Sequence, residues 1–272
     1  MATVSDLDGA AARAAVLSQA ARVTALLRAD GDPGRPALGD WDVADLAAHV
    51  SHSLDGFTAA VRGAGAVLDD VWDLSTLSGV LVAGESTRTL AGLADRIEAS
   101  VAAFTTTIDA ADEGAVVPWL VKGVDVPLTL LVCEALNELV VHGRDLAHAC
   151  GAPWPIERAH AVLVLEGFLF PSLDALGRTM VDQQAAAGLR ACFEVHLRGG
   201  GSTFVCFDEG DLAIGRERPV TVDCHLWVDP VAFLLVSWGR VSQWPAIGRG
   251  QLLAWGRRPW LGLKLRALLR NP

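Results

Sequence analysis

The period of the apolar residues changes part-way along the chain, and this change constrains the fold more than any other feature. Before about residue 150, apolar residues recur every three or four positions, as in the segment 16–27, which predicts amphipathic helices. Beyond about residue 190 they alternate with polar residues, which predicts strands with one buried face. Pro153 and Pro155 separate the two patterns. We therefore predict an α+β protein with two domains, 1–152 and 153–272.

The first domain contains four predicted helices. The second of them starts after Asp42, a good N-cap, and has Asp45 in its first turn, where the helix dipole favours an anion. The fourth begins near Pro127, which suits a helix start, and ends before Gly151. The predicted helices cover about 16–27, 43–61, 86–107 and 127–150. Four helices joined by loops predict a four-helix bundle.

The second domain mixes helices and strands. A run of three glycines, 199–201, joins two alternating segments and predicts a turn. His196 and His225 fall on the polar faces of their predicted strands, as ordinary surface residues do. The predicted helices cover 156–177, 230–239 and 259–269, and the predicted strands cover 191–198, 203–207, 221–228 and 250–255. This order predicts a small α+β domain.

Composition and charge exclude several classes of protein. Apolar residues make up 51% of the 272 positions, too many for an intrinsically disordered chain. The net charge of −10 argues against nucleic-acid binding, although the segment 230–272 carries seven basic residues and no acid. No uncharged apolar run reaches about 18 residues, and the N-terminus lacks a signal pattern. We expect a cytoplasmic monomer or weak dimer with no membrane or nucleic-acid partner.

The five cysteines do not form a recognisable motif. Their spacings contain no CxxC pair and their number is odd, so neither a disulfide framework nor a four-cysteine zinc site is expected. Cys133 and Cys150 lie among apolar residues, which predicts small buried side chains.

The fourth predicted helix carries the residues with metal-binding chemistry. Glu138 and His142 are four residues apart at the inner edge of the apolar stripe, so they lie on one face of the helix. That spacing lets a carboxylate and an imidazole share one cation. Glu134 and Asp145 lie about one turn to either side, where each can accept a hydrogen bond from an imidazole. The alternative is an ordinary Glu–His pair on a helix surface.

A third ligand has to come from another helix, and the second predicted helix offers two histidines. His52 points away from the apolar stripe, whereas His49 lies at its margin, nearer the bundle interior. We therefore predict His49, Glu138 and His142 as the metal ligands. One carboxylate and two imidazoles leave a fourth position open, as in catalytic zinc sites.

These segments resemble a known family. Residues 41–49, Trp-Asp-Val-Ala-Asp-Leu-Ala-Ala-His, resemble the opening motif of the mycothiol-dependent maleylpyruvate isomerases, and residues 137–147, Asn-Glu-Leu-Val-Val-His-Gly-Arg-Asp-Leu-Ala, resemble their second motif. Asn137 and Arg144 depart from the family's usual His and Trp, which puts the substrate in doubt. The resemblance implies a DinB-like bundle that binds zinc through His49, Glu138 and His142, and a sterol-carrier-like C-terminal domain.

The resemblance also implies an activity. Zinc, or another divalent metal, would activate mycothiol as a thiol cosubstrate, either for cis–trans isomerisation of a maleylpyruvate-like substrate or for transfer of the thiol to an electrophile. We predict Arg240 as a catalytic residue that binds a substrate carboxylate, because a guanidinium fits a carboxylate bidentately. A structural role, capping the helix 230–239, is the alternative for Arg240. A non-catalytic small-molecule or lipid carrier using the C-terminal domain, and an interaction protein using the basic C-terminal helix, are alternatives for the whole chain.

Overall fold

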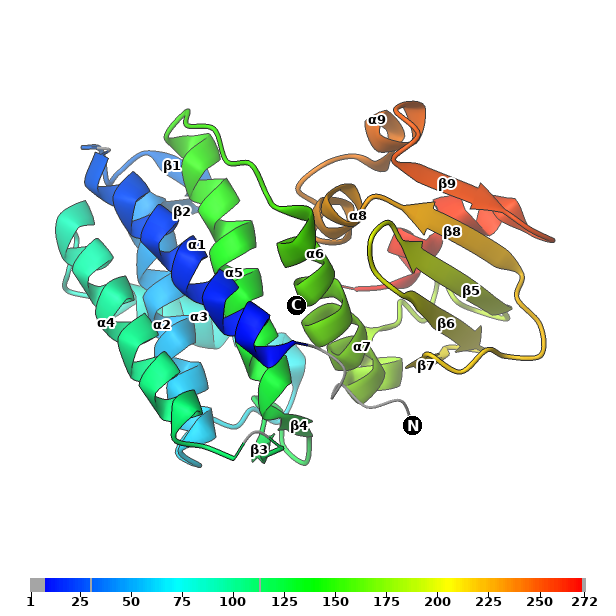
Figure 1. Cartoon of the computed structure of the whole chain (residues 1–272), viewed down its shortest axis with the longest axis horizontal. Coiled ribbons are helices and arrows are strands. Elements are labelled where there is room, and N and C mark those ends of the chain that lie inside the picture. The colour runs from blue at the N-terminus through cyan, green and yellow to red at the C-terminus, as the bar shows by residue number, and fades with distance from the viewer. Residues whose placement is uncertain (1–7, 30, 113, 271–272) are drawn as a thin grey trace. The chain divides into compact units, whose positions relative to one another are not determined.

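The computed structural model of the chain describes residues 8–270 except residues 30 and 113. The described chain divides into two compact units, one spanning Asp8–Pro155 and one that begins at Ile156. The first unit is mainly helical and the second contains a five-stranded sheet (Figure 1). The predicted α+β class is confirmed.

Four long helices form the first unit as a bundle. They are α1 (Gly9–Ala29), α2 (Val43–Val61), α4 (Leu90–Asp109) and α5 (Leu128–Ala149). Both α1 and α2 pack against α4 and α5, which closes the ring of four (Figure 1). Side chains such as Leu27, Leu54, Ile97 and Leu139 are fully buried between them. The predicted helices therefore exist and meet along their apolar stripes.

A capping box fixes the start of α2. The Asp45 N–H donates to Asp42 Oδ1 over 2.7 Å, and the Asp42 N–H donates to Asp45 Oδ2 over 3.2 Å. Arg88 bridges both carboxylates, with Nη2 3.2 Å from Asp42 and Nη1 2.8 Å from Asp45. A cap of this kind stabilises a helix by about 1 kcal/mol. Because it sets where α2 begins, it also sets which way His49 points, two turns further on.

The first unit also contains short elements that periodicity does not reveal. Two small hairpins, β1 (Pro36–Leu38) with β2 (Trp41–Asp42) and β3 (Val116–Pro118) with β4 (Asp125–Pro127), lead directly into α2 and α5. A 3₁₀ turn (Val71–Asp73) and helix α3 (Leu74–Ala83) lie between α2 and α4.

The second unit combines a long broken helix with a mixed sheet. The helix runs as α6 (Arg158–Val164), a π-helical turn (Leu165–Leu169), α7 (Phe170–Leu176) and a 3₁₀ turn (Gly177–Met180). The sheet order is β7-β6-β5-β8-β9, with β5 parallel to β8 and the other pairs antiparallel. Its strands are β5 (Arg190–Leu197), β6 (Ser202–Asp208), β7 (Asp211–Gly215), β8 (Cys224–Val228) and β9 (Leu252–Trp255). Phe193, Val195 and Leu197 of β5 are fully buried, as their alternation predicts.

The C-terminal part of this unit differs from expectation. Helix α8 (Pro230–Ser237) is as predicted, but α9 (Gln243–Gly248) was not expected. The predicted helix 259–269 is wrong: two 3₁₀ turns, Pro259–Leu263 and Leu265–Leu268, replace it. A Cβ at Gly262 would lie 2.8 Å from Leu226 and 2.9 Å from Ala254, so the backbone packs closely on the sheet instead of continuing as a helix. Leu261, Leu265 and Leu268 are buried, whereas Trp260 and Leu263 of the same segment are 56% and 43% exposed.

One disulfide corrects the expectation drawn from cysteine spacing. Cys192 and Cys206 are register partners in β5 and β6 and form a disulfide, with their Cα atoms 4.1 Å apart. The glycine turn between the two strands brings them together, and no spacing motif signals such a cross-strand pair. Cys133, Cys150 and Cys224 take no part in a disulfide.

The long broken helix of the second unit has the length and composition of a membrane-spanning helix. The segment Arg158–Met180 is long and apolar enough to cross a membrane by length and composition, with a mean hydropathy of 1.4. Half of that window is buried inside the fold, where α6 packs against α8 and α7 against β7. A core helix of an α+β domain passes the same test, so the length and composition alone do not indicate a membrane span.

A glycine-to-alanine change in α5 tests the packing of the first unit. A Cβ at Gly143 would lie 2.9 Å from Trp154 Cε2, and the Trp154 ring in turn carries the Arg22 guanidinium 4.0 Å from its centre. Gly143→Ala should lower the free energy of unfolding by about 1–3 kcal/mol, because overpacking displaces the indole. Urea unfolding measures this change.

Gly56 in α2 provides a matched control, since a Cβ there would meet nothing within 4 Å. Gly56→Ala should leave stability unchanged or raise it by up to about 1 kcal/mol through helix propensity. Equal effects of the two substitutions would contradict the packing argument.

Candidate metal centre

Three side chains from two helices converge inside the first unit. His49 Nε2 of α2 lies 3.2 Å from Glu138 Oε2 of α5, and His142 Nε2 lies 3.6 Å from the same oxygen. The ligand-type atoms of the three residues all lie within 4.8 Å of one another. Their side chains are 13–15% exposed. The structure therefore brings together the three residues that the sequence predicts as metal ligands.

Each side chain reaches this point for a local reason. Glu138 and His142 are one helical turn apart on α5, so they share a face. The His49 and His142 rings meet edge to face, with centres 5.0 Å apart, and the Trp41 ring lies 5.0 Å from the His49 ring. Trp41, His49 and His142 thus form a row of ring contacts along one side of the cluster.

The carboxylate of Glu138 is ionised despite its burial. Burial by itself raises the pKa of Glu138, but the adjacent His142 and His49 outweigh it and lower that pKa to about 2. A negative charge therefore lies between two imidazoles in a largely enclosed site.

The donor set fits a divalent cation. Glu138 Oε2 is buried and makes no hydrogen bond of good geometry with any residue in the described part of the chain, and such atoms in native proteins require an explanation. His142 Nδ1 faces Asp145 Oδ2 at 3.3 Å, so Nε2 is the nitrogen directed towards Glu138. An imidazole that is oriented by a carboxylate on its far nitrogen is typical of metal sites. A cation held by these residues accounts for the unsatisfied oxygen.

Glu134 has a different role from the one predicted. The sequence places it as an acceptor for an imidazole, but it is fully buried and accepts a hydrogen bond from Trp119 Nε1 over 2.9 Å. Burial raises the pKa of Glu134 to about 8. Glu134 is therefore mainly protonated at neutral pH. Trp119 comes from the β3–β4 hairpin, which has no periodic signal, so sequence reasoning missed this contact.

His52 lies apart from the three-residue cluster, as expected, but it is not simply solvent-facing. Its Nε2 is 3.4 Å from Glu85 Oε2, and its side chain is 18% exposed. Arg96 Nε lies 3.3 Å from the same Glu85 oxygen. Glu85 belongs to the loop between α3 and α4, where no pattern in the sequence marks it as a partner.

Arg240 lies in the second unit, immediately after α8. Its Nη1 donates to the Trp238 carbonyl over 2.9 Å, and Trp238 is the C-cap residue of α8. This contact is the helix-capping role that the sequence left open. Its predicted contact with a substrate stays a prediction.

The first unit supplies no reactive thiol on α5. Cys133 is the cysteine of that helix, and its side chain is buried between apolar neighbours. Burial raises the pKa of Cys133 to about 12, so its thiolate is absent at neutral pH.

Comparison with known proteins points to one family. The family model described as the mycothiol maleylpyruvate isomerase N-terminal domain matches residues 12–147, a range that contains the whole cluster. A crystal structure of the mycothiol-dependent maleylpyruvate isomerase is similar, with a TM-score of 0.54 at 16% identity over 93% of this chain and 95% of that one. A histidine-to-alanine mutant of such an enzyme matches with a TM-score of 0.55, 16% identity and the same coverage. At this identity the likeness shows the fold. A search of curated proteins finds no match.

The buried Glu134 predicts an unusual dependence of stability on pH. Because burial raises its pKa from 4.5 to about 8, the unfolded chain loses this proton at lower pH than the folded protein does. Stability should therefore fall as the pH rises from about 4.5 to 8. Glu134→Gln keeps an acceptor for Trp119 and removes the titration, so it should raise Tm at pH 8 by several degrees and by less at pH 5.

Calorimetry across this pH range provides the measurement. Glu157→Gln is the matched control, because the Glu157 side chain is 65% exposed. The same pH slope in both variants would show that Glu134 does not carry the effect.

Proposed function

Because the chain belongs to the mycothiol maleylpyruvate isomerase family, we propose that it is an enzyme that uses a metal ion to activate a low-molecular-weight thiol, mycothiol. The observation that carries this proposal is the cluster of His49, Glu138 and His142, in which an ionised carboxylate faces two imidazole nitrogens at 3.2 and 3.6 Å. Zinc is the metal that best suits such a ligand set, although nickel also accepts imidazole and carboxylate ligands.

The ligands would be His49 Nε2, Glu138 and His142 Nε2. Bound there, the metal supplies the positive charge that keeps a coordinated thiol deprotonated at neutral pH. Three protein ligands would leave room for one further ligand, such as the sulfur of the thiol.

The residues around the cluster set the positions and the charge of the proposed ligands. Asp145 Oδ2 lies 3.3 Å from Nδ1, the far nitrogen of His142. The capping box at Asp42 sets the direction of His49. Glu134 keeps its proton and so adds no second negative charge one turn from Glu138. These contacts favour one further anionic ligand from outside the protein, and a thiolate is such a ligand.

We propose isomerisation as the reaction. The sulfur of the thiolate forms a bond to one carbon of a cis C=C that is conjugated to a carbonyl, and the π electron pair moves onto the carbonyl oxygen. Rotation about the resulting single bond is followed by return of the electron pair and loss of the thiolate, which gives the trans product and regenerates the thiol. Retention of the C–S bond, with protonation of the adjacent carbon, gives thiol transfer by the same first step.

The proposed metal site predicts the behaviour of a ligand variant. His142→Ala should lose at least about 90% of the bound zinc, because loss of one of three protein ligands should cost at least the tenfold in affinity that loss of an outer-shell partner typically costs, while the helical circular dichroism of the bundle stays unchanged. Metal analysis of the purified variant, after dialysis against zinc, gives the stoichiometry.

His148→Ala is the matched control, since His148 is an exposed histidine on the same helix. It should retain one zinc per chain. Full zinc content in His142→Ala would show that the ligands are other residues.

A second prediction concerns Arg240, which we propose as the contact for a substrate carboxylate. Arg240→Lys should lower kcat/KM by about tenfold or more, because lysine loses the bidentate fork, and should leave the zinc content unchanged. The assay follows a maleylpyruvate-type substrate with and without mycothiol, and activity should require the thiol.

Arg249→Lys, at an exposed position of the same basic segment, is the control and should keep wild-type kinetics. An unchanged rate in Arg240→Lys would reject the role of that residue. Turnover of the wild-type enzyme without added thiol would reject the thiol mechanism as a whole.

A further inference from the structure

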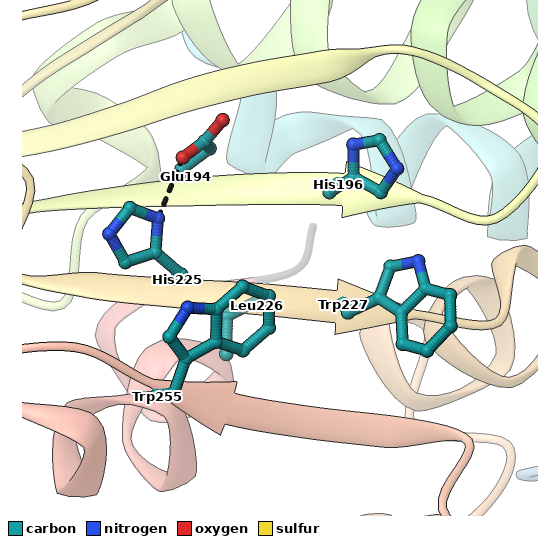
Figure 2. A pocket seen from close by; sticks show the side chains of 6 residues that line it. All are labelled: Glu194, His196, His225, Leu226, Trp227 and Trp255. Atoms are coloured by element: carbon teal, nitrogen blue, oxygen red, sulfur yellow. Dashed lines mark hydrogen bonds and ion pairs between the residues drawn. The ribbon is translucent and has the colours of Figure 1, made fainter.

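The outward face of the sheet in the second unit carries an aromatic cluster that the proposed reaction does not use. Figure 2 shows the pocket that it forms, which has a volume of about 440 Å³. Its lining residues come from β5, β8 and β9: Glu194, His196, His225, Leu226, Trp227 and Trp255. The strand register aligns Glu194 with His225 and His225 with Trp255, so three side chains form one row across the sheet.

Two indole rings on this face are exposed to solvent. Trp255 is 50% exposed and Trp227 is 41% exposed, which is unusual because tryptophan is on average highly buried. The His225 and Trp255 rings are nearly parallel, with centres 5.5 Å apart and planes inclined by 14°. In Figure 2 these rings and that of Trp227 present their faces in the same direction. They offer a flat aromatic surface on which another flat ring can stack.

The polar groups of the pocket are fixed in place. His225 Nδ1 lies 2.7 Å from Glu194 Oε2. A carboxylate oxygen only accepts, so Nδ1 carries the proton that it donates, and in the neutral tautomer of this ring Nε2 presents a lone pair to the pocket. Gly256 allows this arrangement, because a Cβ there would lie 3.1 Å from the His225 ring. His196 Nδ1 is likewise engaged, with Ser202 Oγ at 2.9 Å, which leaves its Nε2 for a ligand.

We propose that this pocket binds a planar aromatic molecule that carries a hydroxyl or amino group. The flat ring stacks on Trp255 and Trp227, and its O–H or N–H donates to His225 Nε2. The six lining residues include a carboxylate and no lysine or arginine, so they do not favour a phosphate or carboxylate ligand. Arg198 is stacked 4.4 Å over the Trp227 ring, and its guanidinium donates to the Gly250 carbonyl. The charge pattern therefore selects a neutral donor.

The proposal is tested by calorimetric titration of the full-length zinc-loaded protein with 2-naphthol, which is planar and carries a hydroxyl donor. We expect 2-naphthol to bind at least about tenfold more tightly than its anionic analogue 2-naphthoate or its saturated analogue 2-decalol. Trp255→Ala should weaken 2-naphthol binding about fivefold or more through lost stacking. His225→Phe keeps a ring and removes the acceptor, so it should abolish the preference of 2-naphthol over naphthalene.

Two control variants separate this pocket from the rest of the protein. Trp244→Ala removes an indole that is 62% exposed on α9 and should leave affinity unchanged. His142→Ala should also leave it unchanged, because the pocket does not depend on the proposed metal site. No binding of 2-naphthol by the wild type, or equal affinity in wild type and Trp255→Ala, would overturn the proposal. A dimer in sedimentation velocity that dissociates in Trp255→Ala would overturn it in favour of a second copy of the chain as the occupant.

Discussion

The ionised carboxylate of Glu138 is the group on which the interior of the first unit depends. A buried charge without compensation destabilises a fold by several kcal/mol, and this one lies between helices whose other facing residues are mainly apolar. The imidazoles of His49 and His142, whose Nε2 atoms lie 3.2 and 3.6 Å from Glu138 Oε2, are the groups that compensate it. The capping box at the start of α2 and the position of Asp145 beside His142 Nδ1 belong to the same local framework.

Glu134 and Glu138 show how strongly the surroundings of a carboxyl group set its pKa. They are one turn apart on α5 and both are largely buried, yet burial raises the pKa of Glu134 to about 8 while the adjacent histidines lower that of Glu138 to about 2. Trp119 gives Glu134 one neutral donor, which is too little to hold an anion. Pairs of carboxyl groups whose pKa values are separated by their surroundings are a feature of functional sites. With Glu134 neutral, Glu138 is the carboxyl group of this pair that carries a charge beside the two imidazoles.

The sequence predicts the cluster well because each of its determinants is local. An i, i+4 spacing places Glu138 and His142, and an N-cap seven residues upstream places His49. The features that the sequence does not predict all depend on contacts between segments that are far apart along the chain. Cys192 meets Cys206 only through the register of two strands, Glu85 reaches His52 from a loop, and Trp119 reaches Glu134 from a hairpin. The C-terminal segment 259–269 has apolar residues at helical spacing, but tight packing of Gly262 on the sheet overrides that propensity.

The same two residue types, Glu and His, appear at both sites of the molecule, and their geometry gives them different chemistry. In the bundle, the Nε2 atoms of His49 and His142 point at one oxygen of Glu138, so three lone-pair-bearing atoms face one point and favour a cation. On the sheet, parallel register sets Glu194 beside Nδ1 of His225, so the carboxylate is satisfied and the remaining nitrogen faces outward between exposed indoles. Convergent acceptors select a metal, whereas one outward acceptor beside flat rings selects a neutral aromatic donor. Backbone geometry, rather than residue identity, therefore decides which ligand each Glu–His pair can hold.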